Sequence, residues 1–336
     1  ARYIAWQTLH KQGLQAVPAL LEMARDNNPV YRARALWLLA AVPASGQDYV
    51  AQAADMAAKD RDVNIRSMAL RILRQHHRDP LPLIEKLAQD DSPAVRRECF
   101  VALRGCPAEQ VPALWSKLAA QVDGSDRWYL EAAGIAADGR WDACLAKYLA
   151  DQSSKVNGEA LSDDGVRAVI WRSRAEQTPK LLADILNRSD ISAAEAARYL
   201  RAMDFQSGPH KEEALLQLAF TTAGGDKDKA AVINAAALEC LLRARDLADG
   251  PPSPPAPSKL LASSAGTSQF VQLVEKFRLA DHYPQLLAIA QREPSSQLGV
   301  DAIRALLNLG DRQTIRDAIL SSNAELALAT ASALTA

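Results

Sequence analysis

The chain has 336 residues, which is enough for two ordinary domains or one long stack of repeats. Its 39 basic and 40 acidic residues leave a net charge of −1, which disfavours nucleic acid or an anionic membrane as the main partner. Apolar residues make up 49% of the sequence, so a continuous core is feasible, but no apolar run approaches the roughly 20 residues of a transmembrane segment and no signal peptide is visible.

One pattern recurs through residues 26–103 and predicts the architecture of this part of the chain. An aspartate is followed six residues later by an arginine, and then by apolar residues at helical spacing. The copies contain Asp26 and Arg32, Asp60 and Arg66, and Asp90 and Arg96, and Arg2 belongs to a fourth copy that lacks its start. The arginines lie 30, 34 and 30 residues apart. A fixed period of this length indicates stacked units of one supersecondary type.

Each unit is predicted to be a helical hairpin. Apolar residues fall at i, i+3, i+4 and i+7 or i+8 in every copy, which is the period of a helix. A second helix is expected in each unit, over residues 17–24, 49–58, 81–88 and 111–120. A hairpin of roughly 30–35 residues cannot bury its own apolar face, so Leu39, Leu73 and Leu103 are expected to be buried against neighbouring units. A small residue is expected to let the paired helices approach closely, at Ala5, Ala35, Ala69 and Cys99.

The spacing of aspartate and arginine predicts an ion-pair ladder. Each aspartate lies in the turn ahead of a helix, where its carboxylate can accept hydrogen bonds from backbone N–H groups. Each arginine is expected to reach the aspartate of the next unit. The alternative is a basic stripe that binds phosphate. Acidic and basic residues alternate here, whereas a phosphate-binding surface needs clustered positive charge, so the ladder is favoured.

This pattern resembles HEAT repeats, the two-helix units of α-solenoids, and the resemblance is strong over residues 1–120. It implies an all-α fold, an α–α superhelix built as a HEAT-like or armadillo-type solenoid of helical hairpins.

The period blurs from about residue 125, although helices continue. Residues 151–165 and 221–229 are expected to be loops, and Ser192 is expected to cap a helix over 193–203. Residues 250–258 (GPPSPPAPS) are expected to form an extended spacer. We therefore divide the chain into regular HEAT-like repeats (1–124), divergent helical repeats (125–249), a proline-rich linker or loop (250–268) and C-terminal HEAT-like repeats (269–336).

Three further runs carry a closer resemblance, DRWYLEAAGIAADGRWD (126–142), VIWRSRAEQTPKLLADIL (169–186) and RAMDFQSGP (201–209). They are similar to the helical-repeat region of large planctomycete and verrucomicrobial proteins. Those proteins place a β-propeller resembling glucose/sorbosone dehydrogenases before this region and a cytochrome c domain with a CxxCH motif after it. The runs FVQLVEKFRLADHY (270–283) and DAIRALLNLG (301–310) fit the stretch that precedes the haem domain.

The resemblance implies a parent protein in the periplasm or cell envelope that carries haem c and, as a further candidate, a quinone cofactor in its other domains. This chain contains neither the propeller nor a CxxCH motif, so no haem ligand or dehydrogenase residue is carried over to a position here, and no cofactor is expected in this chain. The sequence begins inside a repeat and ends in a helical run, so we expect a fragment of a longer protein.

The most suggestive polar group is Trp171-Arg172-Ser173-Arg174. Arg174 lies three residues after Trp171, close enough for its guanidinium to stack on the indole. If Arg172 and Arg174 faced a groove, they could grip a carboxylate or a phosphate. The alternative is pairing of these arginines between helices beside a buried tryptophan. Nearby aromatic residues are expected to be core, with a partner-docking patch as the rival interpretation: Trp128, Tyr129, Trp141 and Tyr148.

Other polar motifs have plainer interpretations. His76 and His77 point about 100° apart on a helix, so they suit a solvated helix end better than a metal site. Asp163 and Asp164 suit a turn or a helix cap better than calcium, which needs oxygen ligands at several fixed spacings. Cys99 is expected to be a small buried hydrophobe, with a disulfide to Cys106 as the weaker alternative. The sequence contains no serine-nucleophile motif, P-loop, GxGxxG or HExxH, so we expect no enzyme in this chain.

The sequence therefore predicts a non-catalytic scaffold that holds domains of the same polypeptide in register or docks a protein partner. The candidate interaction patch is Trp128, Trp141, Trp171, Arg172 and Arg174. The alternative is a ligand-binding or enzymatic solenoid with a site around Trp171–Arg174. Arginines lining a concave pocket would favour that alternative, and a buried, paired arrangement would favour the scaffold.

Overall fold

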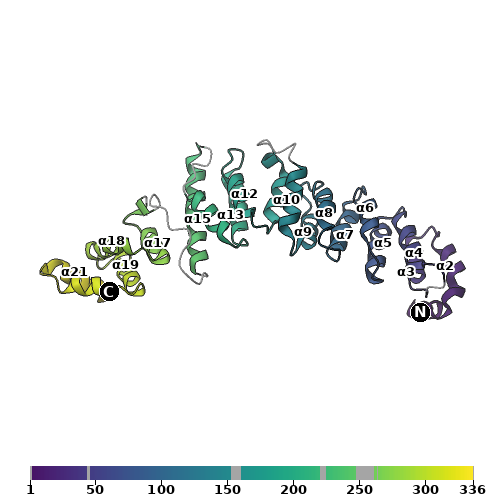
Figure 1. The fold of residues 1–336 in the computed structure, drawn as a ribbon, viewed down its shortest axis with the longest axis horizontal. Coiled ribbons are helices and arrows are strands. Elements are labelled where there is room, and N and C mark those ends of the chain that lie inside the picture. Colours follow the sequence, from purple (N-terminus) through teal and green to yellow (C-terminus); the bar gives the residue numbers. More distant parts are fainter. Residues whose placement is uncertain are drawn as a thin grey trace. The chain divides into compact units, whose positions relative to one another are not determined.

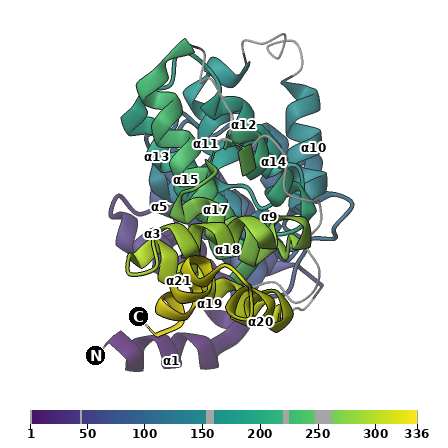
Figure 2. The ribbon, with the colours of Figure 1, turned by 90° about the vertical axis from the view of Figure 1, so that its left-hand side faces the viewer.

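The computed structural model describes residues 2–43, 46–152, 160–219, 225–246, 261–262 and 264–335. Within these ranges the fold is all-α, and the ribbons show helices and no strands (Figures 1 and 2). The predicted class, a solenoid of helical hairpins, is confirmed. The chain divides into two compact units, Ala1–Thr178 and Pro179–Ala336. The boundaries predicted near residues 124 and 249 stay predictions, and the predicted spacer at 250–258 lies outside the described residues.

The first unit consists of successive helices joined by short turns. They are α1 (Arg2–Gln12), η1 (Gly13–Ala16), α2 (Val17–Met23), α3 (Pro29–Ala40), α4 (Tyr49–Ala58), α5 (Val63–Gln75), α6 (Leu81–Leu87), α7 (Pro93–Leu103), α8 (Val111–Ala119), α9 (Arg127–Ala137), α10 (Trp141–Asp151), η3 (Ala160–Ser162) and α11 (Asp164–Arg172). The second helices of the hairpins end within one residue of the predicted positions.

Two sets of helices make up the stack. Helices α3, α5, α7, α9 and α11 each pack against the next one in this series. The intervening helices cover them: α4 packs on α3 and α5, α6 packs on α7, and α8 packs on α7, α9 and α10. This arrangement lets each hairpin bury its apolar face against its neighbours, as a solenoid requires.

The core follows the predicted stripes. Leu39, Leu73 and Leu103 are buried, and the small residues Ala35, Ala69 and Cys99 are fully buried beneath them. Ala5 differs, because it is exposed and lines an open groove together with Tyr3 and Trp6 of α1 and Tyr31 of α3. The close approach predicted at Ala5 is therefore wrong.

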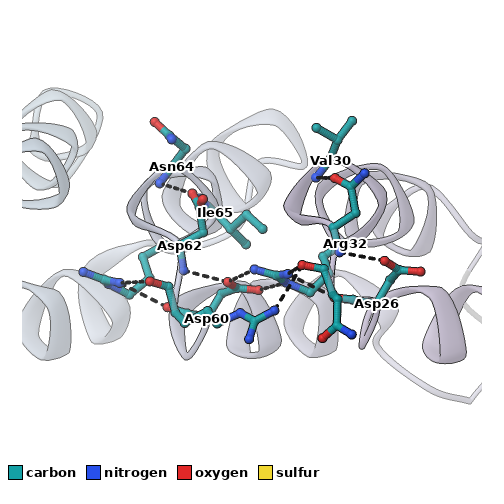
Figure 3. A network of polar contacts seen from close by, with 11 residues as sticks. Asp26, Val30, Arg32, Asp60, Asp62, Asn64 and Ile65 are labelled. Carbon is teal, nitrogen blue, oxygen red and sulfur yellow. Dashed lines mark hydrogen bonds and ion pairs between the residues drawn. The ribbon is translucent and has the colours of Figure 1, made fainter.

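The series α3, α5, α7 and α9 begins at equivalent cap positions, Asn28, Asp62, Ser92 and Asp126. The side chains of Asn28, Asp62 and Asp126 accept hydrogen bonds from backbone N–H groups of the first helical turn; Figure 3 shows the one that Asp62 accepts from Asn64. The caps fix a common register, in which a residue is placed by its distance from the cap.

The predicted ion-pair ladder is confirmed at two steps. Nε and Nη2 of Arg32 donate to the two carboxylate oxygens of Asp60, both at 2.7 Å (Figure 3). Arg66 repeats this with Asp90 at 2.7 and 2.9 Å. In each case Nη1 of the arginine also donates to backbone carbonyls five and six residues earlier. Each arginine thus ties the turn before its own helix to the turn before the next.

The ladder changes at its third step. The register places Gly124 where Asp90 stands in the previous unit, and Leu130 where Arg96 stands. Arg96 keeps its hydrogen bonds to the carbonyls of Asp90 and Asp91. Its guanidinium lies 5.4 Å from the ring centroid of Tyr129, so an aromatic ring takes the place of the carboxylate.

The ladder yields a prediction about pH. The Arg66 guanidinium holds the pKa of the Asp90 carboxyl below its usual range. A depressed pKa in the folded state contributes stability above the unfolded value of about 3.9, and this contribution is lost as the pH falls through the folded pKa. We expect Asp90→Asn to destabilise the first unit by about 1–2 kcal/mol at pH 7, and the difference from the wild type to shrink below about pH 4.

Urea unfolding followed by tryptophan fluorescence measures this effect, because all six tryptophans lie in the first unit. The neighbouring exposed Asp91 supplies the control variant Asp91→Asn, which should be nearly neutral. Equal effects of the two substitutions, or an Asp90→Asn effect that does not change between pH 7 and acid, would contradict the ladder as a source of stability.

The second unit is also built of packed helices. They are α12 (Thr178–Leu186, whose first residue belongs to the first unit), α13 (Ala193–Met203), α14 (Pro209–Leu218), α15 (Lys227–Asp246), α17 (Ser268–Phe277), η5 (Ala280–His282), α18 (Tyr283–Arg292), α19 (Gln297–Asn308), α20 (Arg312–Ile319) and α21 (Ala324–Thr335). Ser192 caps α13 as predicted and forms a capping box with Glu195. Helix α18 packs on α19 and α21, and the three lie together in both views (Figures 1 and 2).

The described helices bear on two further predictions. None of them combines the length and the apolarity that a membrane crossing requires. All four cysteines are buried free thiols, which confirms Cys99 as a core residue and excludes the alternative disulfide to Cys106 in this structure. Burial raises the pKa of the Cys99 thiol to about 12, so the thiolate is suppressed.

Candidate protein-interaction groove

A groove of about 590 Å³ crosses three helices of the first unit, α5, α7 and α9, which are neighbours in the packed series. We call it the α5–α9 groove. Its lining residues are Asn64, Ser67 and Arg71 from α5, Ala94, Arg97, Glu98 and Val101 from α7, and Trp128, Glu131, Ala132 and Ile135 from α9. This volume lies within the range of pockets that bind ligands.

The groove is one helical stripe repeated three times. Counted from the caps Asp62, Ser92 and Asp126, its residues occupy positions 2, 5 and 9, with position 6 added on α7 and α9. Positions 2, 5 and 9 share one face of a helix, since the period is 3.6 residues. Because the helices pack in one series, their equivalent stripes lie side by side. The groove therefore follows from the repeat itself.

One end of the groove is apolar. Trp128, at position 2 of α9, leaves 71% of its surface exposed. Ile135, at position 9 of the same helix, leaves 38% exposed. Val101 and Ala132 lie between them on the lining. A large aromatic surface beside aliphatic side chains, open to solvent, is typical of a surface that binds a partner.

The other end is polar and carries paired charges. Nε and Nη2 of Arg71 donate to Oε2 of Glu98 at 2.9 and 2.7 Å, and Nη1 of Arg74 donates to Oε1 at 3.2 Å. The Glu98 side chain is only 9% exposed, whereas those of Arg71 and Arg74 are 58% and 44% exposed. One buried carboxylate is thus shared by two arginines that reach into solvent.

Arg172 belongs to the same face but is engaged within the protein. It stands at position 9 of α11, and its Nε donates to Glu131 at 3.0 Å. Its guanidinium lies 5.9 Å from the ring of Trp141. It also crosses over Gly134, where a Cβ atom would come within 2.4 Å of it. Arg172 therefore joins α11 to α9 and α10, which is the paired arrangement that favours a scaffold.

The structure separates the members of the predicted patch. Trp128 is exposed and lines the groove, so the core interpretation is wrong for this residue. Its exposed indole is available for the docking interpretation. Trp141 is buried beneath Arg172 and belongs to the core. Trp171 is partly buried and Arg174 is exposed after the end of α11, where Nη1 of Arg174 donates to the carbonyls of Arg172 and Ser173. The predicted stacking of Arg174 on Trp171 stays a prediction.

The rest of the aromatic cluster is core, as predicted. Tyr129 and Tyr148 are buried. The ring of Tyr148 lies 6.1 Å from Trp115, which sequence reasoning did not single out, and the ring of Tyr129 lies 5.3 Å from Phe100. The indole N–H of Trp115 donates to the carbonyl of Ala133 at 2.8 Å, which holds α9 against α8. The groove wall that carries Trp128 rests on this buried layer.

The remaining candidates have structural roles. Asp163 caps α11 and accepts from the backbone N–H of Val166 at 2.9 Å, as predicted. His76 ends α5, and His77 follows it with a positive φ of 53°. In the part of the chain that the structure describes, no group of three or more histidine, cysteine, aspartate or glutamate side chains is placed to hold a metal ion.

Sequence reasoning missed Arg71, Glu98 and Ile135. The signal that could have found them is the cap register. Once Asp62, Ser92 and Asp126 are aligned, positions 2, 5 and 9 of successive helices fall on one face. The repeated arginines and aspartates align the turns between hairpins, but they carry no information about the residues at these other positions.

No family model matches the chain, and no curated protein matches it.

Proposed function

We propose that this chain is a non-catalytic helical-repeat scaffold that binds an extended segment of a protein along the α5–α9 groove. The observation that carries the proposal is the stripe of groove residues repeated on three stacked helices, with Trp128 largely exposed at one end. Stacked hairpins offer long surfaces of this kind for binding.

The pairing of the charged residues supports a scaffold rather than an enzyme or a ligand-binding solenoid at Trp171–Arg174. Arg172 is held by Glu131 and Trp141, and Arg71 is held by Glu98. The groove's arginines alternate with carboxylates, an arrangement that suits protein better than nucleic acid. The apolar end supplies the buried contact area that protein recognition needs.

We expect the wild-type chain to enrich linear peptides from a displayed random library, and Trp128→Ala to lower the affinity of the selected peptides at least tenfold. Aromatic residues that become buried in an interface often carry a large share of the binding free energy. Fluorescence anisotropy with the selected peptides measures the loss. Trp6→Ala is the matched control, because Trp6 is also an exposed tryptophan but lies on α1 outside the groove. Failure to enrich peptides, or equal binding by Trp128→Ala, would refute the proposal.

A wider proposal follows from the resemblance of residues 126–142, 169–186 and 201–209. The chain would position a dehydrogenase-like propeller relative to a cytochrome c domain of the same polypeptide, in the cell envelope. The redox chemistry, haem c and any quinone cofactor would then belong to those other domains. The full-length gene product tests this proposal: we expect a propeller before these residues and a CxxCH motif after them, and a gene product with neither would leave a scaffold of another kind.

A further inference from the structure

We infer that the α5–α9 groove selects a short extended peptide that carries an acidic side chain and, on the same face four to six residues away, a large apolar side chain. This inference rests on the proposed function and specifies its partner. It is argued from the charges, the dimensions and the two unlike ends of the groove.

The charges of the groove are not fully balanced. The arginines that line it or pair with its lining are Arg71, Arg74, Arg97 and Arg172, and their carboxylate partners are Glu98, Asp126 and Glu131. Arg74, Arg172 and Asp126 pair with lining residues from outside the lining, so that four positive charges stand beside three negative ones when these partners are counted. The excess lies at the polar end, where Arg71 and Arg74 share the single carboxylate of Glu98.

Arg71 has the geometry to bind a second carboxylate. Glu98 occupies its Nε and Nη2 atoms, whereas Nη1 has no hydrogen-bond acceptor among the described residues. The pairing with Glu98 raises the pKa of Arg71, so the group stays charged. Arg97 also lines the groove, from α7, and its ion pair with Asp126 is long, at 3.7 Å. An acidic side chain placed here would meet two guanidinium groups that have donors to spare.

The apolar end sets the second requirement. Trp128 and Ile135 stand two helical turns apart on the groove face of α9, with Glu131 and Ala132 between them, and Val101 lines the groove from α7. A phenylalanine or a leucine placed here would be covered by an indole face on one side and aliphatic groups on the other. A ligand that satisfies only one end would leave the other end solvated.

The dimensions favour an extended segment. The two ends lie on α5 and α9, two helix-to-helix steps apart, and each step is about 8–10 Å. An extended chain advances about 3.3 Å per residue and returns to the same face every second residue, so side chains four or six positions apart span roughly 13–20 Å.

Defined peptides test the inference. Eight-residue capped peptides of serine and alanine, with one glutamate and one phenylalanine four or six positions apart in either order, are titrated with the full chain and followed by fluorescence anisotropy. We expect at least one of these arrangements to bind, and replacement of its glutamate by glutamine to weaken binding to the wild type about fivefold. In Arg71→Gln the same replacement should have no effect, because the charge that reads the glutamate is gone.

Two controls separate this contact from general effects. Arg104→Gln removes an exposed arginine that pairs with Asp138 outside the groove, and it should keep the full preference for glutamate. Trp128→Ala should abolish the preference for phenylalanine over serine and leave the preference for glutamate. Thermal unfolding of each variant shows that the fold is intact.

The outcomes distinguish the inference from the function on which it rests. Equal binding of the glutamate and glutamine peptides, a preference that survives in Arg71→Gln, or no binding by any of these peptides would overturn the inference. If the random library still yields peptides that Trp128→Ala loses, and these peptides lack acidic residues, the scaffold function stands and the acidic specificity fails. If the library yields nothing, both fail.

Discussion

Trp115→Ala is expected to destabilise the first unit by about 3–5 kcal/mol, the largest effect of any single substitution discussed here. Trp115 is fully buried on α8. Its ring lies 6.2 Å from Phe100 on α7, and 5.8 and 6.1 Å from Trp141 and Tyr148 on α10, all edge to face. Its N–H donates to α9 at Ala133. The Trp115 side chain thus connects α8 with α7, α9 and α10. Its truncation would leave a cavity among these four helices that the surrounding atoms can close only in part.

Urea unfolding followed by the remaining five tryptophans measures the loss, and Trp115→Phe separates its causes. The phenyl ring keeps most of the burial and loses the hydrogen bond, so this variant should lose much less stability than Trp115→Ala. Trp128→Ala is the converse case, because an exposed side chain contributes little to folding and we expect a change within about 0.5 kcal/mol. If Trp128→Ala proved as destabilising as Trp115→Ala, the division between a buried support and an exposed binding wall would be wrong.

The regular part of the fold could be predicted because its signals are local and repeated. The aspartate and arginine of each copy mark the turn and the start of a helix, and the apolar stripe marks the buried face. The turn and the buried face can each be identified within one hairpin. The constant spacing of the copies then predicts that successive hairpins stack in the same way. For this reason the sequence alone predicts that Arg32 pairs with Asp60 and that Arg66 pairs with Asp90.

The same reasoning weakens where a copy departs from the pattern. Gly124 and Leu130 replace the ladder pair in the copy that contains α9, so no rule of spacing places the partner of Arg96. Tyr129 fills that place through its ring, a contact that depends on how α9 leans on α7. Composition could not separate Trp128 from Trp141 either, since only the packing of α9 and α10 decides that Trp128 faces solvent and Trp141 faces Trp115.

The groove required information that no single hairpin contains. Its polar end joins Arg71 on α5 to Glu98 on α7, and Arg172 comes from α11 to meet Glu131 on α9. Each pair is a contact between neighbouring units, 27 and 41 residues apart in sequence. The sequence indicated that Arg172 was either paired or facing a groove. Because α11 packs against α9, Arg172 pairs with Glu131.

Gly165→Ala is expected to destabilise the first unit by about 3 kcal/mol, because α11 approaches the α8–α9 turn too closely for a side chain. A Cβ atom on Gly165 would come within 2.0 Å of the carbonyl oxygen of Val122 and 3.1 Å of its carbon. Both atoms are backbone, so no rotamer change relieves the clash. Alanine is intrinsically better than glycine in a helix by roughly 1 kcal/mol, and a loss of stability would show that the steric term prevails.

Gly105→Ala is the control, since its Cβ would meet nothing nearer than the carbonyl oxygen of Ala102 at 3.9 Å, and we expect it to be neutral or stabilising. Gly134→Ala gives a third case, because the atoms nearest to a Cβ there belong to the flexible end of Arg172. That side chain can swing away, so this variant should lose less stability than Gly165→Ala while it frees Glu131 of its partner. The carboxylate of Glu131 would then lack the compensating charge of Arg172, and binding of glutamate peptides should weaken. Urea unfolding and peptide titration of these variants then tell whether α11 supports the fold, the charge of the groove, or both; a neutral Gly165→Ala would mean that α11 does not press on the α8–α9 turn.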